Sequence, residues 1–167
     1  MFYRFFLAAL SVMLTALAIE DLHRRTVSDA HLTAVNIWAL TGHVADMAIG
    51  GAGVWPISLR AGIEAGIVIL IGSVILSLIM ARLTGRFFLG GADIKLLTTG
   101  ALCLGLARVL VGLCAAVIAA AFYLLFRALS GRQKKELSET IPFVPFLIIG
   151  FATVYMAGTQ IINWYTA

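Results

Sequence analysis

Asp21 and Asp93 are the residues of this sequence best suited to chemistry. Asp21 closely follows the apolar run 1–19, and Asp93 directly precedes the apolar run 94–107. Two carboxylic acids held close together cannot both ionise comfortably, so one keeps its proton while the other stays charged. The charged acid can take a proton from water while the protonated acid polarises a peptide carbonyl. The pair therefore predicts hydrolysis of a peptide bond without metal, cofactor or covalent intermediate.

Two glycines, Gly90 and Gly91, stand just before the second acid. Glycine permits backbone conformations and close approaches that other residues resist, which suits a substrate strand lying beside the acid. The alternative interpretation is that both acids only cap helix ends, with Asp93 paired to Arg86 or Lys95. Charge and position alone favour this alternative, and the glycines favour the catalytic interpretation.

The other titratable side chains have plainer interpretations. Glu64 lies one helical turn from Arg60, so the two can form a surface pair. Asp46 is expected in an exposed outer loop. His23 and His31 are interpreted as exposed loop histidines rather than metal ligands. The remaining acids are expected to be solvated surface charges: Glu20, Asp29, Glu136 and Glu139.

The composition indicates that the lipid bilayer is the solvent of this chain. Of its 167 residues, 62% are apolar and 12% are charged, whereas soluble domains have about 25% charged residues. A soluble domain and a disordered chain are therefore both disfavoured. A membrane-spanning helix needs about 20 mostly apolar residues. The sequence accordingly predicts an all-α, polytopic membrane protein with one domain over 1–167 and about six spans, expected at 1–19, 30–48, 61–81, 94–107, 109–126 and 141–165.

The basic residues predict how the chain is threaded. If the first span runs outside to inside, nine of the twelve lysines and arginines fall in inner loops: Arg24, Arg25, Arg82, Arg86, Lys95, Arg127, Arg132, Lys134 and Lys135. The positive-inside rule then places both termini outside the cytoplasm and both acids at its face. The net charge of +4 is thereby explained without a nucleic-acid partner.

Two further features accompany this threading. Gly62 and Gly66 form a GxxxG motif, which we interpret as a site of close helix packing. Trp55, Trp164 and Tyr165 fall at the outer boundaries of spans, where aromatic belts are found.

Three blocks of the sequence resemble the type IV prepilin peptidases, which are membrane aspartic peptidases of the GxGD group. Asp21–Asp29 (DLHRRTVSD) resembles the first family block, an aspartate followed by a basic stretch and an Ile-Pro-Asn-like turn. Gly90–Leu97 (GGADIKLL) is similar to the GxGD block, and Ile141–Leu147 (IPFVPFL) to the proline–phenylalanine block that opens the last span. With the six expected spans, the resemblance covers essentially the whole chain.

The resemblance implies the GxGD peptidase architecture with Asp21 and Asp93 as the catalytic pair. It implies that the substrate is the short basic leader of a prepilin or pseudopilin, cut at the cytoplasmic face of the inner membrane, typically just after a glycine. Pro142 and Pro145 are expected to break regular helix near the acids. The residues expected to support the substrate cleft are Gly90, Gly91, Ala92, Lys95, Pro142 and Pro145.

The sequence departs from the family pattern at several points. Ala92 stands where the family has the second glycine of GxGD, and Ser28 stands where proline is usual. These changes leave open a divergent cleavage specificity. The chain also lacks the cysteine-rich insertion of the long bifunctional members, so we do not expect methylation, and the compact form resembles the peptidases of Tad/Flp-type pilus systems.

Other functional classes fit less well. A zinc peptidase HExxH motif is absent, and the nearest serine motif, at 128–131 (ALSG), lacks the first glycine of GxSG. The alternative that stays open is a non-enzymatic transporter or pilus assembly subunit whose acids carry protons or contact partners. A transport pathway favours acids near the bilayer midplane, whereas Asp21 and Asp93 are predicted at its inner edge.

Overall fold

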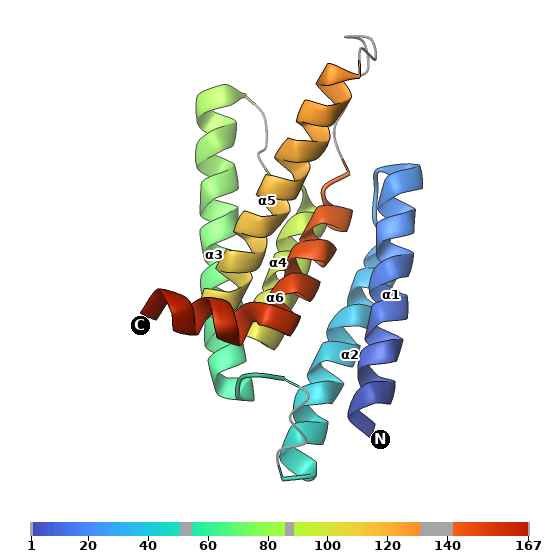
Figure 1. The fold of residues 1–167 in the computed structure, drawn as a ribbon, viewed down its shortest axis with the longest axis vertical. Coiled ribbons are helices and arrows are strands. Elements are labelled where there is room, and N and C mark those ends of the chain that lie inside the picture. Colours follow the sequence, from blue (N-terminus) through green and yellow to red (C-terminus); the bar gives the residue numbers. More distant parts are fainter. Residues whose placement is uncertain (1, 51–54, 86–88, 131–141, 167) are drawn as a thin grey trace.

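Six helices account for most of the residues that this computed structural model describes, namely 2–50, 55–85, 89–130 and 142–166 (Figure 1). The helices are α1 (Phe2–Arg24), α2 (Asp29–Ala48), α3 (Leu59–Thr84), α4 (Gly91–Leu104), α5 (Leu106–Leu129) and α6 (Val144–Thr166). Each helix coincides with one of the expected apolar runs, and no strand occurs among the described residues. The prediction of an all-α fold is therefore confirmed.

Local chemistry explains where several helices begin and end. The hydroxyl oxygens of Ser28 and Ser58 accept hydrogen bonds from backbone N–H groups in the first turns of α2 and α3, at 3.3 and 3.4 Å. Ser28, a departure from the family pattern, thus serves as a helix cap. Gly85 ends α3 with a φ of 71°, and Gly105 separates α4 from α5 with a φ of 84°. Glycine adopts this left-handed backbone without a steric penalty, which is why the fourth helix stops before residue 107.

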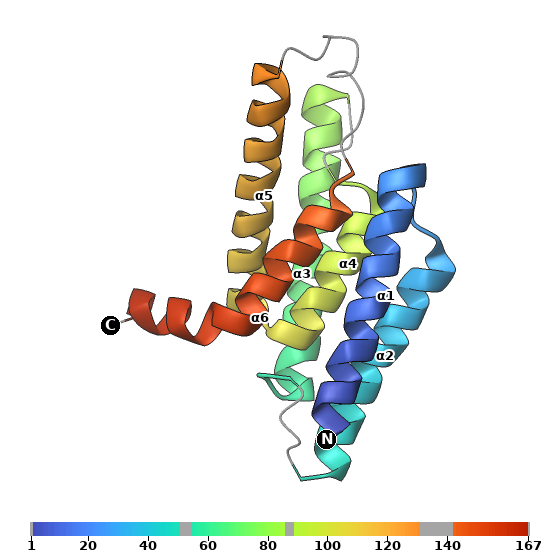
Figure 2. The ribbon, with the colours of Figure 1, turned by 45° about the vertical axis from the view of Figure 1, so that its right-hand side comes forward.

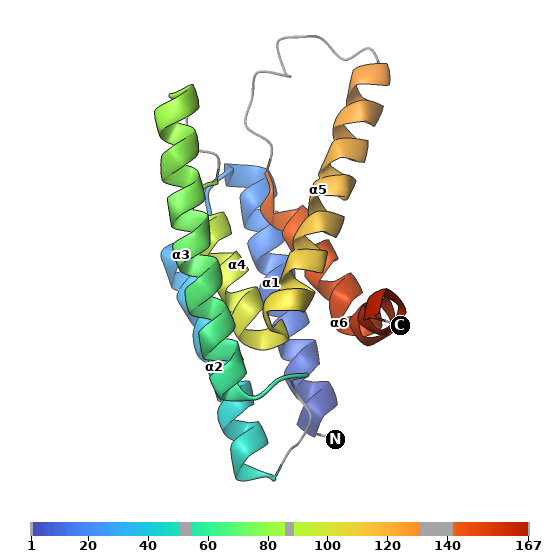
Figure 3. The same ribbon diagram turned by 90° about the vertical axis from the view of Figure 1, so that its left-hand side faces the viewer.

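Successive helices run in alternating directions, so their ends gather in two groups (Figures 1 and 3). We call one group the aspartate end, because it holds Asp21 of α1 and Asp93 of α4. The opposite group contains the start of α3 with Arg60 and the start of α5 with Arg108. The described basic residues that were expected in inner loops all lie at the aspartate end: Arg24, Arg25, Arg82, Lys95 and Arg127.

The surfaces of α3 and α5 are those of helices in contact with lipid. Within the described residues, these two helices are long and apolar enough to cross a membrane. Large apolar side chains such as Ile71 of α3 and Phe122 of α5 are exposed, which is typical of membrane contact. α4, by contrast, has 14 residues and a length of about 21 Å, less than the hydrocarbon core of about 30 Å. Six full-length spans therefore stay a prediction.

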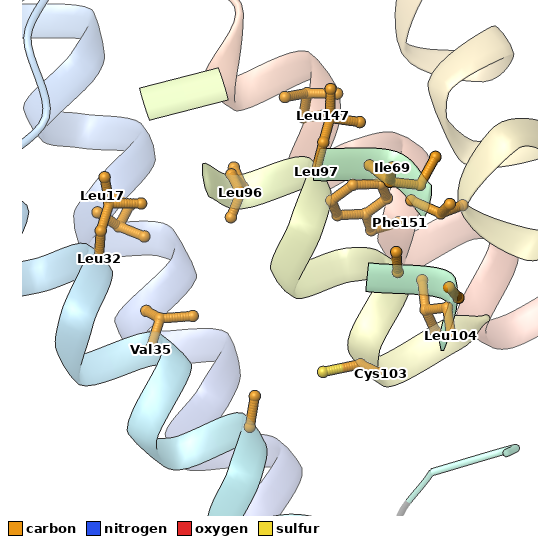
Figure 4. Packing of buried hydrophobic residues seen from close by; sticks show 14 of the residues in the cluster. Leu17, Leu32, Val35, Ile69, Leu96, Leu97, Cys103, Leu104, Leu147 and Phe151 are labelled. Carbon is orange, nitrogen blue, oxygen red and sulfur yellow. The ribbon is translucent and has the colours of Figure 1, made fainter. Parts of the chain in front are cut away.

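α4 forms the centre of the bundle. It packs against α2, α3, α5 and α6. Its fully buried Leu96 and Leu97 lie between Leu17 and Leu32 of the first two helices and Leu147 of α6 (Figure 4). The apolar core therefore holds the helix that carries Asp93 from several sides.

Glycines allow α3 and α4 to approach closely. A Cβ atom on Gly62 would overlap the carbonyl oxygen of Leu102, and one on Gly66 would contact the carbonyl oxygen of Thr98 at 3.7 Å. Both glycines are buried against α4. The interpretation of the GxxxG motif as a packing site is confirmed.

Trp55 is a core residue at the end of the bundle opposite the acids. It is only 6% exposed, and its indole N–H donates to the carbonyl oxygen of Ala39 at 3.0 Å. Asp46 lies within α2 and accepts the backbone N–H of Trp55 at 3.0 Å, so its expected place in an outer loop is wrong. The aromatic-belt prediction is also wrong for Trp55, because the indole finds its polar partner inside the protein. The side chains of Trp164 and Tyr165 lie outside the described residues.

The substitution Gly62→Ala tests the contact between α3 and α4. The added Cβ meets a backbone oxygen of Leu102, which moves only if the helices separate. We expect the free energy of unfolding to fall by about 1–3 kcal/mol, as in other overpacked sites, with a lower melting temperature in detergent. Gly72→Ala on the same helix is the control, because no described atom lies within 4 Å of its Cβ. Equal melting temperatures for the two variants would contradict the close contact.

Candidate active site

Asp21 lies in the last turn of α1 with its carboxylate inside the protein. The residue is 7% exposed, and its Oδ2 accepts a hydrogen bond from the backbone N–H of Val144 at 3.2 Å. Val144 is the first residue of α6, so Asp21 caps α6 from another helix. The positive end of the α6 dipole favours the ionised form of this carboxylate.

The backbone changes direction directly after this turn. Arg25 has a φ of 54°, and its N–H donates to the carbonyl oxygen of Asp21 at 2.8 Å. A left-handed residue other than glycine costs roughly 1–2 kcal/mol, so the surrounding structure must hold Arg25 in place. α1 consequently stops at Arg24, and α2 begins at Asp29.

Asp93 lies in the first turn of α4, three residues after Gly90. Its Oδ2 accepts a hydrogen bond from the backbone N–H of Gly90 at 3.2 Å. The interpretation of Asp93 as a cap is thus correct for the local structure. The carboxylate is also partly buried, which a fully solvated cap would not be.

The two glycines before Asp93 contribute space rather than an unusual backbone. Gly90 has a φ of −70° and a ψ of 155°, an extended conformation that any residue adopts, and Gly91 is the first residue of α4. Neither position therefore uses a conformation that only glycine favours, and the close approach of a substrate strand stays a prediction. Gly91 is exposed, and no described atom lies within 4 Å of a Cβ placed on it. Ala92 is partly buried and packs against the core.

Burial is the main influence on the protonation of both acids. Asp21 follows the apolar run of its own helix, and Asp93 precedes the apolar run of its own helix. Burial raises the pKa of Asp93 to about 6, with the hydrogen bond from Gly90 lowering it and the charge of Asp21 raising it further. Burial also raises the pKa of Asp21, against the hydrogen bond from Val144. The pair can therefore hold one protonated and one ionised carboxyl group near pH 6.

Lys95 has an ion partner other than Asp93. Its Nζ pairs with Asp29 of α2, whose side chain is exposed as expected of a surface charge. Arg86, the other partner considered for Asp93, lies outside the described residues. The first turn of α2 reaches α4 because the chain folds back after Arg25.

The same turn of α2 also reaches α1. His31 Nδ1 lies 2.7 Å from Glu20 Oε2. His31 is therefore an exposed helical residue with an acidic partner, so only its expected place in a loop is wrong. Glu20, expected as a surface charge, has this histidine as its partner. His23 is exposed in the last turn of α1, so its expected place in a loop is also wrong. Glu136 and Glu139 lie outside the described residues.

The prolines begin α6 rather than interrupt it. Pro145 is the second residue of the helix, where a missing N–H removes no helical hydrogen bond. Pro142 precedes the helix and is partly buried. The prolines were expected to break a helix, and they instead lie where α6 begins. The start of α6 directs the N–H of Val144 to Asp21.

Two contacts at this end escaped sequence reasoning. The N–H of Val144 is a backbone group, and no residue type signals its position. Ser77 is buried in the apolar α3, and its hydroxyl donates to the carbonyl oxygen of Leu89 at 3.5 Å, next to Gly90. A serine inside an apolar run is a weak signal of such a contact.

Other groups with binding potential lie away from the acids. A cavity of about 790 Å³ lies at the opposite end of the bundle, where Trp55 and Arg60 contribute to its lining. Across the described parts of the chain, no three His, Cys, Asp or Glu side chains gather in a way that could hold a metal ion. The candidate site therefore consists of Asp21 and Asp93 with the backbone groups that hold them.

Comparison with known families gives an independent result. Residues 8–125, most of the chain, match the model of a family described as the type IV leader peptidase family. The matched segment includes Asp21 and Asp93 and ends before Pro142. No curated protein and no solved structure matches the chain. The match covers two of the three sequence blocks, those that hold Asp21 and Asp93, and this protein belongs to the type IV leader peptidase family.

Proposed function

We propose that this protein is an aspartic endopeptidase that removes the short basic leader of prepilins or pseudopilins. The observation that carries the proposal is the pair Asp21 and Asp93, which come from distant parts of the chain, lie at helix ends in the same end of the bundle and are buried or partly buried there. Membership of the leader peptidase family supports the substrate class.

The proposed mechanism uses both protonation states of the pair. The ionised carboxylate accepts a proton from water while the water oxygen attacks the carbonyl carbon of the scissile peptide bond. The protonated acid donates a hydrogen bond to the carbonyl oxygen, where negative charge develops. The C–N bond then breaks as the leaving nitrogen receives the proton taken from water. The open space beside Gly91 is where we place the extended substrate strand.

The proposed topology places the aspartate end at the cytoplasmic face of the inner membrane. One domain over 1–167 would cross the bilayer six times with both termini outside. The cluster of arginines and lysines at the aspartate end supports this orientation. The partners of the protein are then the bilayer and a prepilin or pseudopilin.

The position of the acids favours this function over proton transport. Asp21 lies in the last turn of α1, and Asp93 in the first turn of α4. A transported proton needs ionisable groups along the depth of the membrane, whereas a leader peptide arriving from the cytoplasm meets groups at a helix end.

Replacing either acid by asparagine tests the catalytic assignment. Asp21→Asn and Asp93→Asn can each retain an oxygen that accepts the backbone N–H of Val144 or Gly90, so both variants should fold. We expect leader removal to fall at least about 100-fold, within the range that general acid–base groups contribute. The measurement is cleavage of co-expressed prepilins whose short basic leaders end in glycine, followed by the change in gel mobility.

The matched control for these variants is Glu64→Gln. Glu64 pairs with Arg60 at 3.0 Å at the opposite end of the bundle, so its variant should cleave normally. Leader removal that survives Asp21→Asn or Asp93→Asn would contradict the assignment of the pair. A folded wild-type protein that cleaves no prepilin of the panel would contradict the substrate class.

The pH dependence of cleavage tests the electrostatics of the pair. Because the pKa of Asp93 is raised to about 6, both acids ionise as the pH rises through that value, and kcat/KM should decline on the alkaline side. Protonation of both acids should cause a second decline at low pH. Bound substrate excludes water from the acids, so the alkaline limb of kcat should lie at a higher pH than that of kcat/KM. A rate independent of pH between 5 and 9 would argue against the shared proton.

A further inference from the structure

The distance between the two acids depends on helices other than their own. α1 packs mainly against α2 and α6, and α4 packs mainly against α2, α3, α5 and α6. α2 and α6 therefore link the helix of Asp21 to the helix of Asp93. Figure 2 shows α2 running alongside α1.

The first turn of α2 contacts one residue close in sequence to each acid. Asp29 pairs with Lys95, two residues beyond Asp93. His31 pairs with Glu20, the residue before Asp21, at 2.7 Å. The Glu20 side chain is only 13% exposed, so this contact lies partly within the protein. One helical turn thus contacts both segments that carry the acids.

A second contact along the same interface fixes α4 against α2. The hydroxyl of Thr99 donates to Asn36 Oδ1 at 2.6 Å, and Thr99 is 5% exposed. Thr99 lies one turn beyond Lys95 on α4, and Asn36 lies two turns beyond Asp29 on α2. A slide or rotation of α4 relative to α2 would break both contacts.

We propose that the first turn of α2 is a positioning element for the catalytic pair, with Asp29 and His31 as its positioning residues. They hold Lys95 and Glu20 and thereby set the spacing of the two carboxylates. This inference rests on the proposed peptidase function. Exposed ion pairs contribute little to stability, whereas a displacement of about 1 Å at reacting groups costs up to about 100-fold in rate. The signature is therefore a lower kcat without a lower melting temperature.

A double-mutant cycle tests the pair of Asp29 and Lys95. The variants are Asp29→Asn, Lys95→Met and the two combined, assayed on a prepilin that the wild-type protein cleaves. We expect each single variant to lower kcat about 3- to 30-fold, with KM within about twofold. The combined variant should be no slower than the slower single variant, because each substitution breaks the same contact.

The outcomes of the cycle separate positioning from other roles. If the two losses in kcat multiply in the combined variant, the two residues act independently, and the proposal for this pair is overturned. If Lys95→Met lowers kcat and Asp29→Asn does not, Lys95 acts without its partner, and the proposal is overturned as well. The combined variant of Arg60→Met with Glu64→Gln removes an exposed ion pair at the other end and should leave kcat unchanged.

The pair of His31 and Glu20 has its own test by conservative rescue. His31→Ala should lower kcat, whereas His31→Lys places an N–H donor within reach of Glu20 and should restore most of the rate. Equal losses for the two variants would contradict a role for this ion pair.

A distance measurement tests the proposal without any substrate. Spin labels at positions 22 and 91, with Cys103 and Cys114 replaced by alanine, report the separation of α1 and α4. We expect a narrow distance distribution that broadens when Asp29→Asn is combined with His31→Ala, and that Glu64→Gln leaves unchanged. An equally narrow distribution would overturn the positioning role even if cleavage is observed. Broadening, where the unlabelled wild-type protein cleaves no prepilin, would reject the proposed function alone.

Discussion

The structure of the aspartate end depends on the partial burial of two carboxylates, those of Asp21 and Asp93. Burial favours the neutral form of both acids, and the charge of Asp21 adds to this effect at Asp93. The N–H groups of Val144 and Gly90 favour the ionised forms. Because these influences oppose each other, neither the neutral nor the ionised form of the acids is strongly favoured, and a proton can be gained or lost during a reaction.

The architecture of the bundle makes this balance attainable. α4 is shorter than its neighbours α3 and α5, which extend beyond its start at the aspartate end (Figures 1 and 3). The first turn of α4, with Asp93, is therefore set back among longer helices. α6 starts beside α1 and directs its N-terminus at Asp21. Each acid consequently lies at a helix N-terminus, where the backbone supplies hydrogen bonds to a negative charge.

Much of this could be predicted from local pattern. The six apolar runs matched the six helices because hydropathy along a segment depends mainly on its own residues. The shared end of Asp21 and Asp93 followed from counting crossings, which needs no knowledge of lateral packing. The close approach at Gly62 was also predictable, since only small residues let two helix backbones come together.

The predictions that were wrong concern contacts between segments that are separate in the sequence. Trp55 was expected at a lipid interface and is buried, because a carbonyl group of α2 offers its indole a partner inside the protein. Lys95 and His31 were assigned without knowing that the turn after Arg25 carries α2 against both acid-bearing helices. In each case the sequence indicated that the side chain is polar or aromatic, but its partner belongs to another helix.

The sequence by itself determined the solvent of this protein, its helices and the end of the bundle where its acids lie. These properties depend on hydropathy, charge and chain direction, which are read along one segment at a time. Only the tertiary structure decided that a backbone N–H of α6 holds Asp21, and that α2 pairs with Glu20 and Lys95 beside the two acids. Such contacts depend on the rotation and depth of neighbouring helices, and helix packing sets these through side chains that no single segment contains.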